Sequence, residues 1–323
     1  MNRTLRIYIS FLVFTVACSL RCYAAGSQRN DSTLDTNQSI HYRKIKVDGV
    51  KIFYREAGPA GAPVVLLMHG YPTSSFMFRN LIPMLSTRYH VIAPDLPGFG
   101  FSDFPSKNAY AYTFDHYAQT MQGFIDQLNL KRFAIYIFDY GAPVGLRLAM
   151  HNPDRITGII TQDGNAYTEG LLDWSHGLVK AFWDNPNAQN RNAMKKFFTI
   201  DGTNFQYRHG VQDQTLIAPE AIYLDQSLMD RPGNLDVQLD LILDYKHNVE
   251  MYPQFQAYLK KYQPKMLVLW GINDPYFSPK GAWAYKRDMP GATVKLYNTG
   301  HFALETNTVD IGQQINQFLI TLK

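Results

Sequence analysis

Apolar and polar positions along residues 40–323 follow two alternating patterns. Short runs of apolar and β-branched residues are typical of parallel strands that are buried on both faces. Longer segments between them carry apolar residues at helical spacing, as in Ser75–Ser86 and Phe114–Leu128. Two further segments, Ile45–Gly49 and Val50–Arg55, predict an opening hairpin. The alternation predicts an α/β fold in which helices flank a mostly parallel central sheet. The strands expected after the hairpin are Val64–Met68, His90–Pro94, Phe133–Phe138, Ile156–Thr161, Met266–Trp270 and Val294–Tyr297.

This rhythm stops between Gly164 and about Tyr258. The segment is aromatic and polar, has helical periodicity, and is broken at Pro186, Pro219 and Pro232. We therefore predict a helical cap over residues 164–258 that is inserted into a core formed by residues 40–163 and 259–323.

The N-terminus has the composition of a secretory signal peptide. Two arginines precede an apolar stretch, Ile7–Cys18, that is too short to span a bilayer, and small residues for cleavage precede Ala25. We predict a signal peptide over residues 1–24 and a secreted or periplasmic mature protein. The polar residues 25–39 are expected to form a flexible arm.

Removal of this leader changes the composition of the mature chain. Both cysteines, Cys18 and Cys22, lie inside the leader, so no disulfide or thiolate metal site is expected afterwards. Three arginines and no acidic residue are lost with it, which lowers the formal net charge from +4 to +1. A nearly neutral protein has no electrostatic footprint for nucleic acid or an anionic membrane, and no stable membrane anchor remains. The expected partners are a small apolar substrate and water.

Three polar residues follow predicted strands in an order that suits nucleophilic catalysis. Asp139 lies in the sequence I-F-D-Y-G between a strand and a helix, which is the setting of a nucleophile elbow. Asp274 follows the strand that ends at Trp270, and His301 follows the last strand. Because ligands bind at the carboxyl edge of a parallel sheet, we expect these three residues to converge. A carboxylate nucleophile indicates attack on an sp3 carbon, since the resulting ester can be cleaved by water.

The motif H-G-Y-P at His69–Pro72 follows the strand Val64–Met68. Its glycine and proline suit a tight loop that directs backbone N–H groups into the site. We expect the N–H groups of Tyr71 and Tyr140 to form an oxyanion hole. A glycine-rich loop at Asp95–Asp103 lacks the spacing of a phosphate cradle and is interpreted as structural.

These motifs, together with H-G-Y-P-T-S-S-F-M-F-R-N at His69–Asn80 and the predicted cap, resemble the haloalkane dehalogenase and epoxide hydrolase branch of the α/β-hydrolases. The resemblance extends from about Tyr42 to Leu322. It implies a cofactor-free reaction in which Asp139 forms an alkyl ester. His301, oriented by Asp274, then activates the water that cleaves this ester.

Some features of the sequence favour a haloalkane substrate and others favour an epoxide. P-T-S-S at Pro72–Ser75, and Ile137 where epoxide hydrolases usually carry glycine, resemble dehalogenases. Dehalogenases, however, typically hold the halide with a tryptophan after the nucleophile and often an asparagine after H-G, whereas this chain has tyrosine at both places. Trp174 or Trp183 of the cap would have to supply the missing N–H donor.

Epoxide opening instead requires a proton donor for the departing oxygen, and a phenol can serve. The resemblance to epoxide hydrolases places such phenols in the cap, with Tyr252 as the first candidate and Tyr167 as the second. We therefore expect an epoxide hydrolase, with a haloalkane dehalogenase as the alternative. The cap tyrosines are Tyr167, Tyr207, Tyr223, Tyr245, Tyr252 and Tyr258.

Two further alternatives remain at this point. Asp163, after the strand Ile156–Thr161, lies near the place where some dehalogenases carry the acid of the triad, although W-G-x-x-D matches the family motif at Asp274 more closely. The chain could also be a binding protein with this fold and no catalysis, but the complete set of nucleophile, acid and histidine argues against that.

Overall fold

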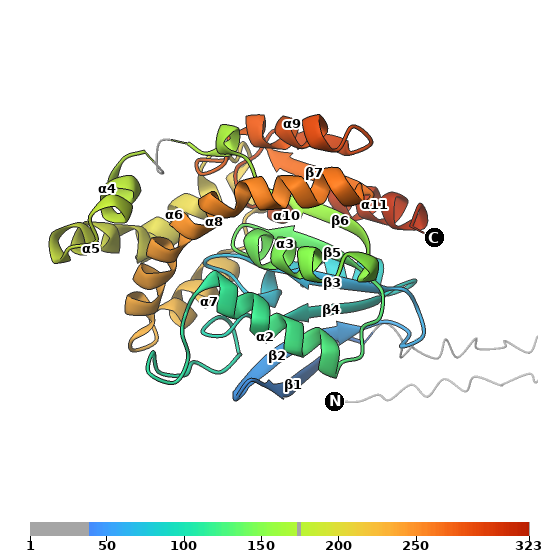
Figure 1. Cartoon of the computed structure of the whole chain (residues 1–323), viewed down its shortest axis with the longest axis horizontal. Coiled ribbons are helices and arrows are strands. Elements are labelled where there is room, and N and C mark those ends of the chain that lie inside the picture. The colour runs from blue at the N-terminus through green and yellow to red at the C-terminus, as the bar shows by residue number, and fades with distance from the viewer. Residues whose placement is uncertain (1–38, 173–175, 323) are drawn as a thin grey trace, which may run out of the picture. The chain divides into compact units, whose positions relative to one another are not determined.

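The computed structural model describes residues 39–172 and 176–322. Eight strands form one sheet in the order β1-β2-β4-β3-β5-β6-β7-β8 (Figure 1). The first two strands form an antiparallel hairpin, β2 pairs antiparallel with β4, and the remaining pairs are parallel. The strands are β1 (His41–Val47), β2 (Val50–Ala57), β3 (Val64–Met68), β4 (His90–Pro94), β5 (Phe133–Phe138), β6 (Ile156–Gln162), β7 (Met266–Gly271) and β8 (Thr293–Tyr297).

Helices cover both faces of this sheet, which explains why its central strands are apolar on both sides. Ile135 and Ile137 of β5 point into one core layer, and Ala134 and Tyr136 point into the other. The first layer is covered by α2 (Phe114–Gln127), α3 (Gly141–His151), α9 (Pro279–Asp288) and part of α8 (Asn234–Tyr262), and the second by α1 (Leu81–Leu85), α10 (Ala303–Thr306) and α11 (Thr308–Ile320).

The predicted α/β fold is confirmed, and most predicted strands agree with the observed ones to within a residue. One helix differs from its prediction. Residues 75–86 form a short 3-10 helix, η2 (Ser75–Phe78), followed by the separate helix α1. Ser74 caps η2 by accepting the N–H of Phe76, and the chain then turns before Leu81.

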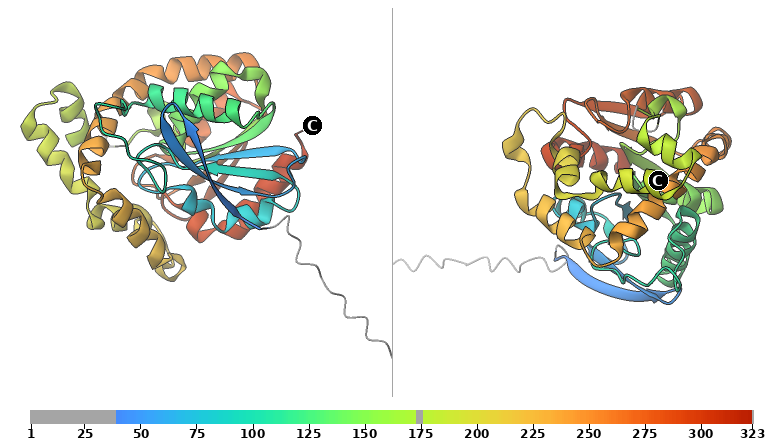
Figure 2. Two further views of the ribbon diagram at one scale, coloured as in Figure 1. Left: turned by 90° about the horizontal axis from the view of Figure 1, so that it is seen from below. Right: turned by 90° about the vertical axis from the view of Figure 1, so that its left-hand side faces the viewer.

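Cap helices gather beyond the carboxyl ends of the parallel strands (Figures 1 and 2). The last of them, α8, runs without a break through the predicted boundary at residues 258 and 259, and its C-terminal part packs on α3 and α9 of the core. The other helices of this region are α4 (Leu178–Asp184), α5 (Ala188–Met194), η6 (Lys195–Phe198), α6 (Ile200–Arg208) and α7 (Pro219–Met229).

The predicted signal peptide at 1–24 and all but the last residue of the predicted arm at 25–39 lie outside the described residues. Within the part of the chain that is described, no helix is both long and apolar enough to cross a membrane.

Candidate active site

Asp139 lies at a sharp turn between β5 and α3. Its φ is +46°, in the left-handed region that residues other than glycine rarely adopt. Two glycines allow this turn to pack closely. A Cβ at Gly70 would lie 2.4 Å from the Asp139 side chain, and a Cβ at Gly141 would lie 2.6 Å from the carbonyl oxygens of Met68 and His69. The sequence thus presents a buried carboxylate at the carboxyl edge of the sheet.

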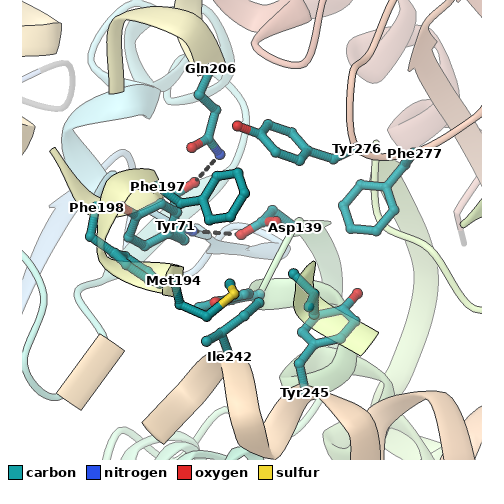
Figure 3. Close-up of a pocket in the computed structure, with 12 residues that line it drawn as sticks. Tyr71, Asp139, Met194, Phe197, Phe198, Gln206, Ile242, Tyr245, Tyr276 and Phe277 are labelled. Atoms are coloured by element: carbon teal, nitrogen blue, oxygen red, sulfur yellow. Dashed lines mark hydrogen bonds between the residues drawn. The ribbon is translucent and has the colours of Figure 1, made fainter. Parts of the chain in front are cut away.

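The H-G-Y-P loop holds this carboxylate through its backbone. The N–H of Tyr71 donates to Asp139 Oδ1 at 2.6 Å (Figure 3). The N–H of Tyr140 also bonds to the carboxyl group. His69 anchors the loop, because its Nδ1 lies 2.9 Å from the oxygen of Gly70 and its Nε2 accepts the N–H of Leu96 at 2.9 Å. Both predicted oxyanion donors therefore contact the predicted nucleophile.

The structure also brings His301 and Asp274 to this carboxylate. His301 Nδ1 lies 2.7 Å from Asp274 Oδ2, and His301 Nε2 lies 3.8 Å from Asp139 Oδ2. Asp274 is held in turn by the N–H groups of Tyr276 and Phe277, which donate to its Oδ1 at 2.7 and 3.1 Å. Asp274 is thus the carboxylate that contacts the His301 ring.

Burial controls the ionisation of these groups. It raises the pKa of Asp139 to about 6, even though the charge of His301 and the two backbone N–H groups favour the carboxylate. At His301, burial opposes the charged form, but the charge and hydrogen bond of Asp274 and the charge of Asp139 outweigh it and raise the pKa. A histidine held in this way can accept a proton and remain paired with Asp274.

An apolar pocket opens above Asp139 (Figure 3). Its walls combine aliphatic and aromatic side chains of the cap with phenols from both the core and the cap. Gln206 of α6 also lines the pocket, and its Nε2 donates to the backbone oxygen of Tyr71 at 2.9 Å. The apolar lining residues are Val179, Met194, Phe197, Phe198, Ile242 and Phe277, and the phenols are Tyr71, Tyr140, Tyr245 and Tyr276.

The cap residues expected from the sequence do not line this pocket within the described part of the chain. Tyr252 is buried behind it, where its hydroxyl accepts Asn165 Nδ2 at 3.2 Å and is hydrogen-bonded to the hydroxyl of Tyr245. Tyr167 donates its hydroxyl to Asp288 at 3.0 Å. The indole N–H of Trp183 donates to the backbone oxygen of Ile242 at 2.6 Å, and Trp174 lies outside the described residues.

Sequence reasoning did not single out three of the polar side chains in the pocket. Tyr245 precedes Tyr252 by two helical turns of α8, and only the rotation of that helix places it in the wall. Tyr276 follows Asp274 in D-P-Y-F, so its place beside the triad acid was a usable signal. Gln206 had no distinguishing sequence context.

The described residues contain no group of three or more His, Cys, Asp or Glu side chains arranged to hold a metal ion.

Proteins that are similar to this chain in sequence include hydrolases, in agreement with the geometry of the site. Residues 63–308 match the family model described as alpha/beta hydrolase fold. An uncharacterized hydrolase of Saccharomyces cerevisiae is 47% identical over 284 residues, which cover 87% of this chain and 97% of that protein. A haloalkane dehalogenase of Psychrobacter cryohalolentis is 39% identical over 310 residues, which cover 88% of this chain and 93% of that protein.

Solved structures show the same fold at lower sequence identity. The epoxide hydrolase CorEH superposes with a TM-score of 0.73 at 20% identity and covers 88% of this chain and all of its own, 100%. A loop variant of a haloalkane dehalogenase from Bradyrhizobium elkanii has a TM-score of 0.69 at 21% identity and covers 88% of this chain and 97% of its own. The chain therefore belongs to the α/β-hydrolase family, has a haloalkane dehalogenase among its relatives, and shares its fold with an epoxide hydrolase.

Proposed function

We propose that this protein is an epoxide hydrolase that converts a small apolar epoxide to a diol through an alkyl ester on Asp139. The observation that carries the proposal is the combination of a buried carboxylate with several phenols in one apolar pocket. A carboxylate supplies the nucleophile, and a phenol supplies the proton that an opening epoxide must receive.

The first step forms the ester. Asp139 Oδ2 lies free of the Tyr71 N–H, which holds Oδ1, so Oδ2 is the oxygen that attacks the ring carbon. As this bond forms, the bond from that carbon to the epoxide oxygen breaks, and the oxygen takes a proton from a phenol. We assign this proton to Tyr245, which enters the pocket from α8 of the cap. Its hydroxyl is also hydrogen-bonded to the hydroxyl of Tyr252, which accepts Asn165 Nδ2, so this chain of contacts holds the Tyr245 phenol in place at the pocket wall.

The second step cleaves the ester. A water between His301 and Asp139 gives one proton to His301 Nε2 while its oxygen attacks the carboxyl carbon of Asp139. Charge then develops on the carboxyl oxygen that faces the N–H groups of Tyr71 and Tyr140. When this intermediate collapses, the ester bond to the substrate breaks and the alkoxide takes the proton from His301. The new Asp139 carboxyl ionises, and its proton restores the phenol.

Dehalogenation is the second candidate, and two observations favour it. The dehalogenase of Psychrobacter cryohalolentis is 39% identical to this chain. Gln206 also places an amide in the pocket, and only one of its two N–H groups is used by Tyr71. We rank this reaction second, because the lining residues in the described part of the chain include no indole to hold a departing halide.

A paired assay separates the two reactions. Purified protein would be given an epoxide and a bromoalkane of the same carbon skeleton, and diol and bromide would be measured. We expect diol from the epoxide at a kcat/KM at least about tenfold above that for bromide release. Asp139→Asn should abolish both. Bromide release without diol formation would reverse the ranking.

A further inference from the structure

Asp163 is an acid at a strand end that the proposed reaction does not use. It directly follows β6, and Phe138 of β5 pairs with Gln162 of β6. Asp139 and Asp163 therefore occupy equivalent places at the ends of adjacent parallel strands, and both have a φ of +46°. The side chain of Asp163 is completely buried, with 0% exposure. Since His301 pairs with Asp274, Asp163 needs another explanation.

The contacts of Asp163 lead to the acid of the triad. Its Oδ1 accepts the N–H of Gly271 at 2.9 Å, and its Oδ2 lies 3.3 Å from Gln162 Nε2. Its carboxyl group is also hydrogen-bonded to the carboxyl group of Asp274. Both acids also bond to the backbone of Gly271. Its N–H donates to Asp163 Oδ1, and its oxygen accepts the N–H of Asp274 at 3.3 Å.

Two carboxyl groups in this contact cannot share a hydrogen bond if both are ionised. Neither is paired with a lysine or an arginine among the described residues. The titratable groups that interact with Asp163 in the described part of the chain are Asp274 and Tyr136. The Tyr136 hydroxyl donates to the side chain of Gln162, whose Nε2 lies 3.2 Å from the backbone oxygen of His301. Burial, followed by the charge of Asp274, holds the pKa of Asp163 well above its usual range. His301 bonds Asp274 and not Asp163, so no cation is paired with the Asp163 carboxyl group among the described residues.

We propose that Asp163 is a positioning residue that remains protonated and donates a hydrogen bond to Asp274, which fixes Asp274 in the orientation that His301 requires. The oxygens of Asp274 then have defined partners: His301 at Oδ2, the N–H groups of Tyr276 and Phe277 at Oδ1, and the proton of Asp163. The effect of Asp163 on turnover rests on the proposed function, but its protonation does not.

The protonation state can be measured without any substrate. Protein labelled with 13C at the aspartate side-chain carboxyls would be titrated by NMR from about pH 5 to about pH 8. We expect a carboxyl signal that stays at the protonated position through neutral pH and is absent from Asp163→Asn. The same signal should persist in Asp225→Asn, which removes a different buried acid. If Asp163→Asn removes only a signal that titrates in the ordinary carboxyl range, the proposal is wrong.

Turnover tests the positioning role. Asp163→Asn keeps an N–H that can donate to Asp274, so its kcat should stay within about threefold of the wild-type value. Asp163→Val has no donor and should hydrolyse the ester at least about tenfold more slowly, while the rate of ester formation is unchanged. Alkylated protein would then accumulate during turnover of Asp163→Val but not of Asp163→Asn.

Other outcomes overturn this role. Equal losses in the two variants would indicate packing only. A large loss in Asp163→Asn, together with an active Asp274→Asn, would make Asp163 the acid that serves His301. If the wild-type protein forms no ester and no diol, the proposed function fails, whereas the NMR result still decides whether Asp163 is protonated.

Discussion

In the proposed reaction, the reactivity of Asp139 depends on its burial. A carboxylate in water is a weak nucleophile with an ordinary pKa, whereas Asp139 is 6% exposed and has a pKa raised to about 6. Its φ of +46° and its close contact with Gly70 hold the carboxylate in the oxyanion site before substrate arrives. In the proposed reaction, the same groups therefore prepare the nucleophile for the first step and stabilise the tetrahedral intermediate of the second.

The raised pKa gives a defined pH dependence. In the proposed reaction only ionised Asp139 attacks the substrate, so kcat/KM for the epoxide should be constant above about pH 6 and fall towards tenfold per pH unit below it. The measurement is a pH profile of kcat/KM with a neutral epoxide, in buffers of constant ionic strength. A profile that stays flat to about pH 4 would show that the nucleophile has an ordinary carboxyl pKa.

The proton donor can be tested with single hydroxyl deletions. Tyr245→Phe should lower kcat/KM for the epoxide by about 10²-fold, since general acid catalysis typically contributes that much. Tyr167→Phe is the matched control, because its hydroxyl bonds Asp288 outside the pocket, and it should change kcat/KM by less than about twofold. Tyr252→Phe should have an intermediate effect through its bond to Tyr245. If Tyr252→Phe lost all activity on the epoxide while Tyr245→Phe stayed active, Tyr252 and not Tyr245 would be the proton donor.

At the scale of elements, the sheet could be predicted from the sequence far better than the cap. Strands such as β3 and β7 are buried on both faces, so each leaves a continuous apolar run with clear ends. Asp139 and Asp274 could be found because each follows such a strand, and His301 because it follows the weaker last strand, β8. The pocket-lining residues of the cap left no comparable signal. The rotation of α8 about its axis decides which of its side chains face the pocket, and the sequence does not reveal that rotation.

The loop after β3 should tolerate no added side-chain carbon at Gly70. Gly70→Ala would place a Cβ 2.4 Å from Asp139, so either the loop or the carboxylate must move. We expect kcat to fall by about 10²-fold through loss of the Tyr71 N–H from the oxyanion site. Gly61→Ala, where an added Cβ meets nothing within 4 Å, should leave kcat unchanged. Wild-type kcat in Gly70→Ala would mean that this contact does not position the nucleophile.

At the scale of the whole molecule, the cap is joined to the catalytic loops by buried contacts. Tyr207 of α6 stacks on Phe302, the residue after His301, with ring centroids 3.9 Å apart. Its hydroxyl donates to Asp225 of α7 at 2.6 Å. Nearby, Arg79 of the core binds both carboxylate oxygens of Glu305 at 2.8 and 2.7 Å. The position of His301 is therefore coupled to cap packing.

The Asp225 contact makes stability depend on pH. Burial raises the pKa of Asp225 to about 8, so folding takes up a proton between the ordinary carboxyl pKa and that value. The contribution of Asp225 to stability is present at low pH and is lost as the pH rises towards about 8. Asp225→Asn keeps an acceptor for Tyr207 and has no proton to bind, so its Tm relative to wild type should rise with pH, by a few degrees at about pH 8.

Thermal unfolding monitored by circular dichroism from about pH 5 to about pH 9 checks this trend. Asp213→Asn is the control, because Asp213 is exposed and hydrogen bonds from Thr215 lower its pKa, so its Tm difference should not rise. A Tm difference for Asp225→Asn that is independent of pH would show that Asp225 is ionised in the folded protein.

The alkyl ester on Asp139 is tested most directly by trapping. His301→Gln removes the base that activates water but leaves Asp139 and its N–H donors in place, so the first step should proceed and the second should stop. After incubation with an epoxide, intact mass spectrometry should show protein heavier by the mass of one epoxide, and peptide mapping should place the addition on Asp139. Asp139→Asn with His301→Gln should show no addition. An unmodified mass in His301→Gln, under conditions in which the wild-type protein forms diol, would contradict the ester mechanism.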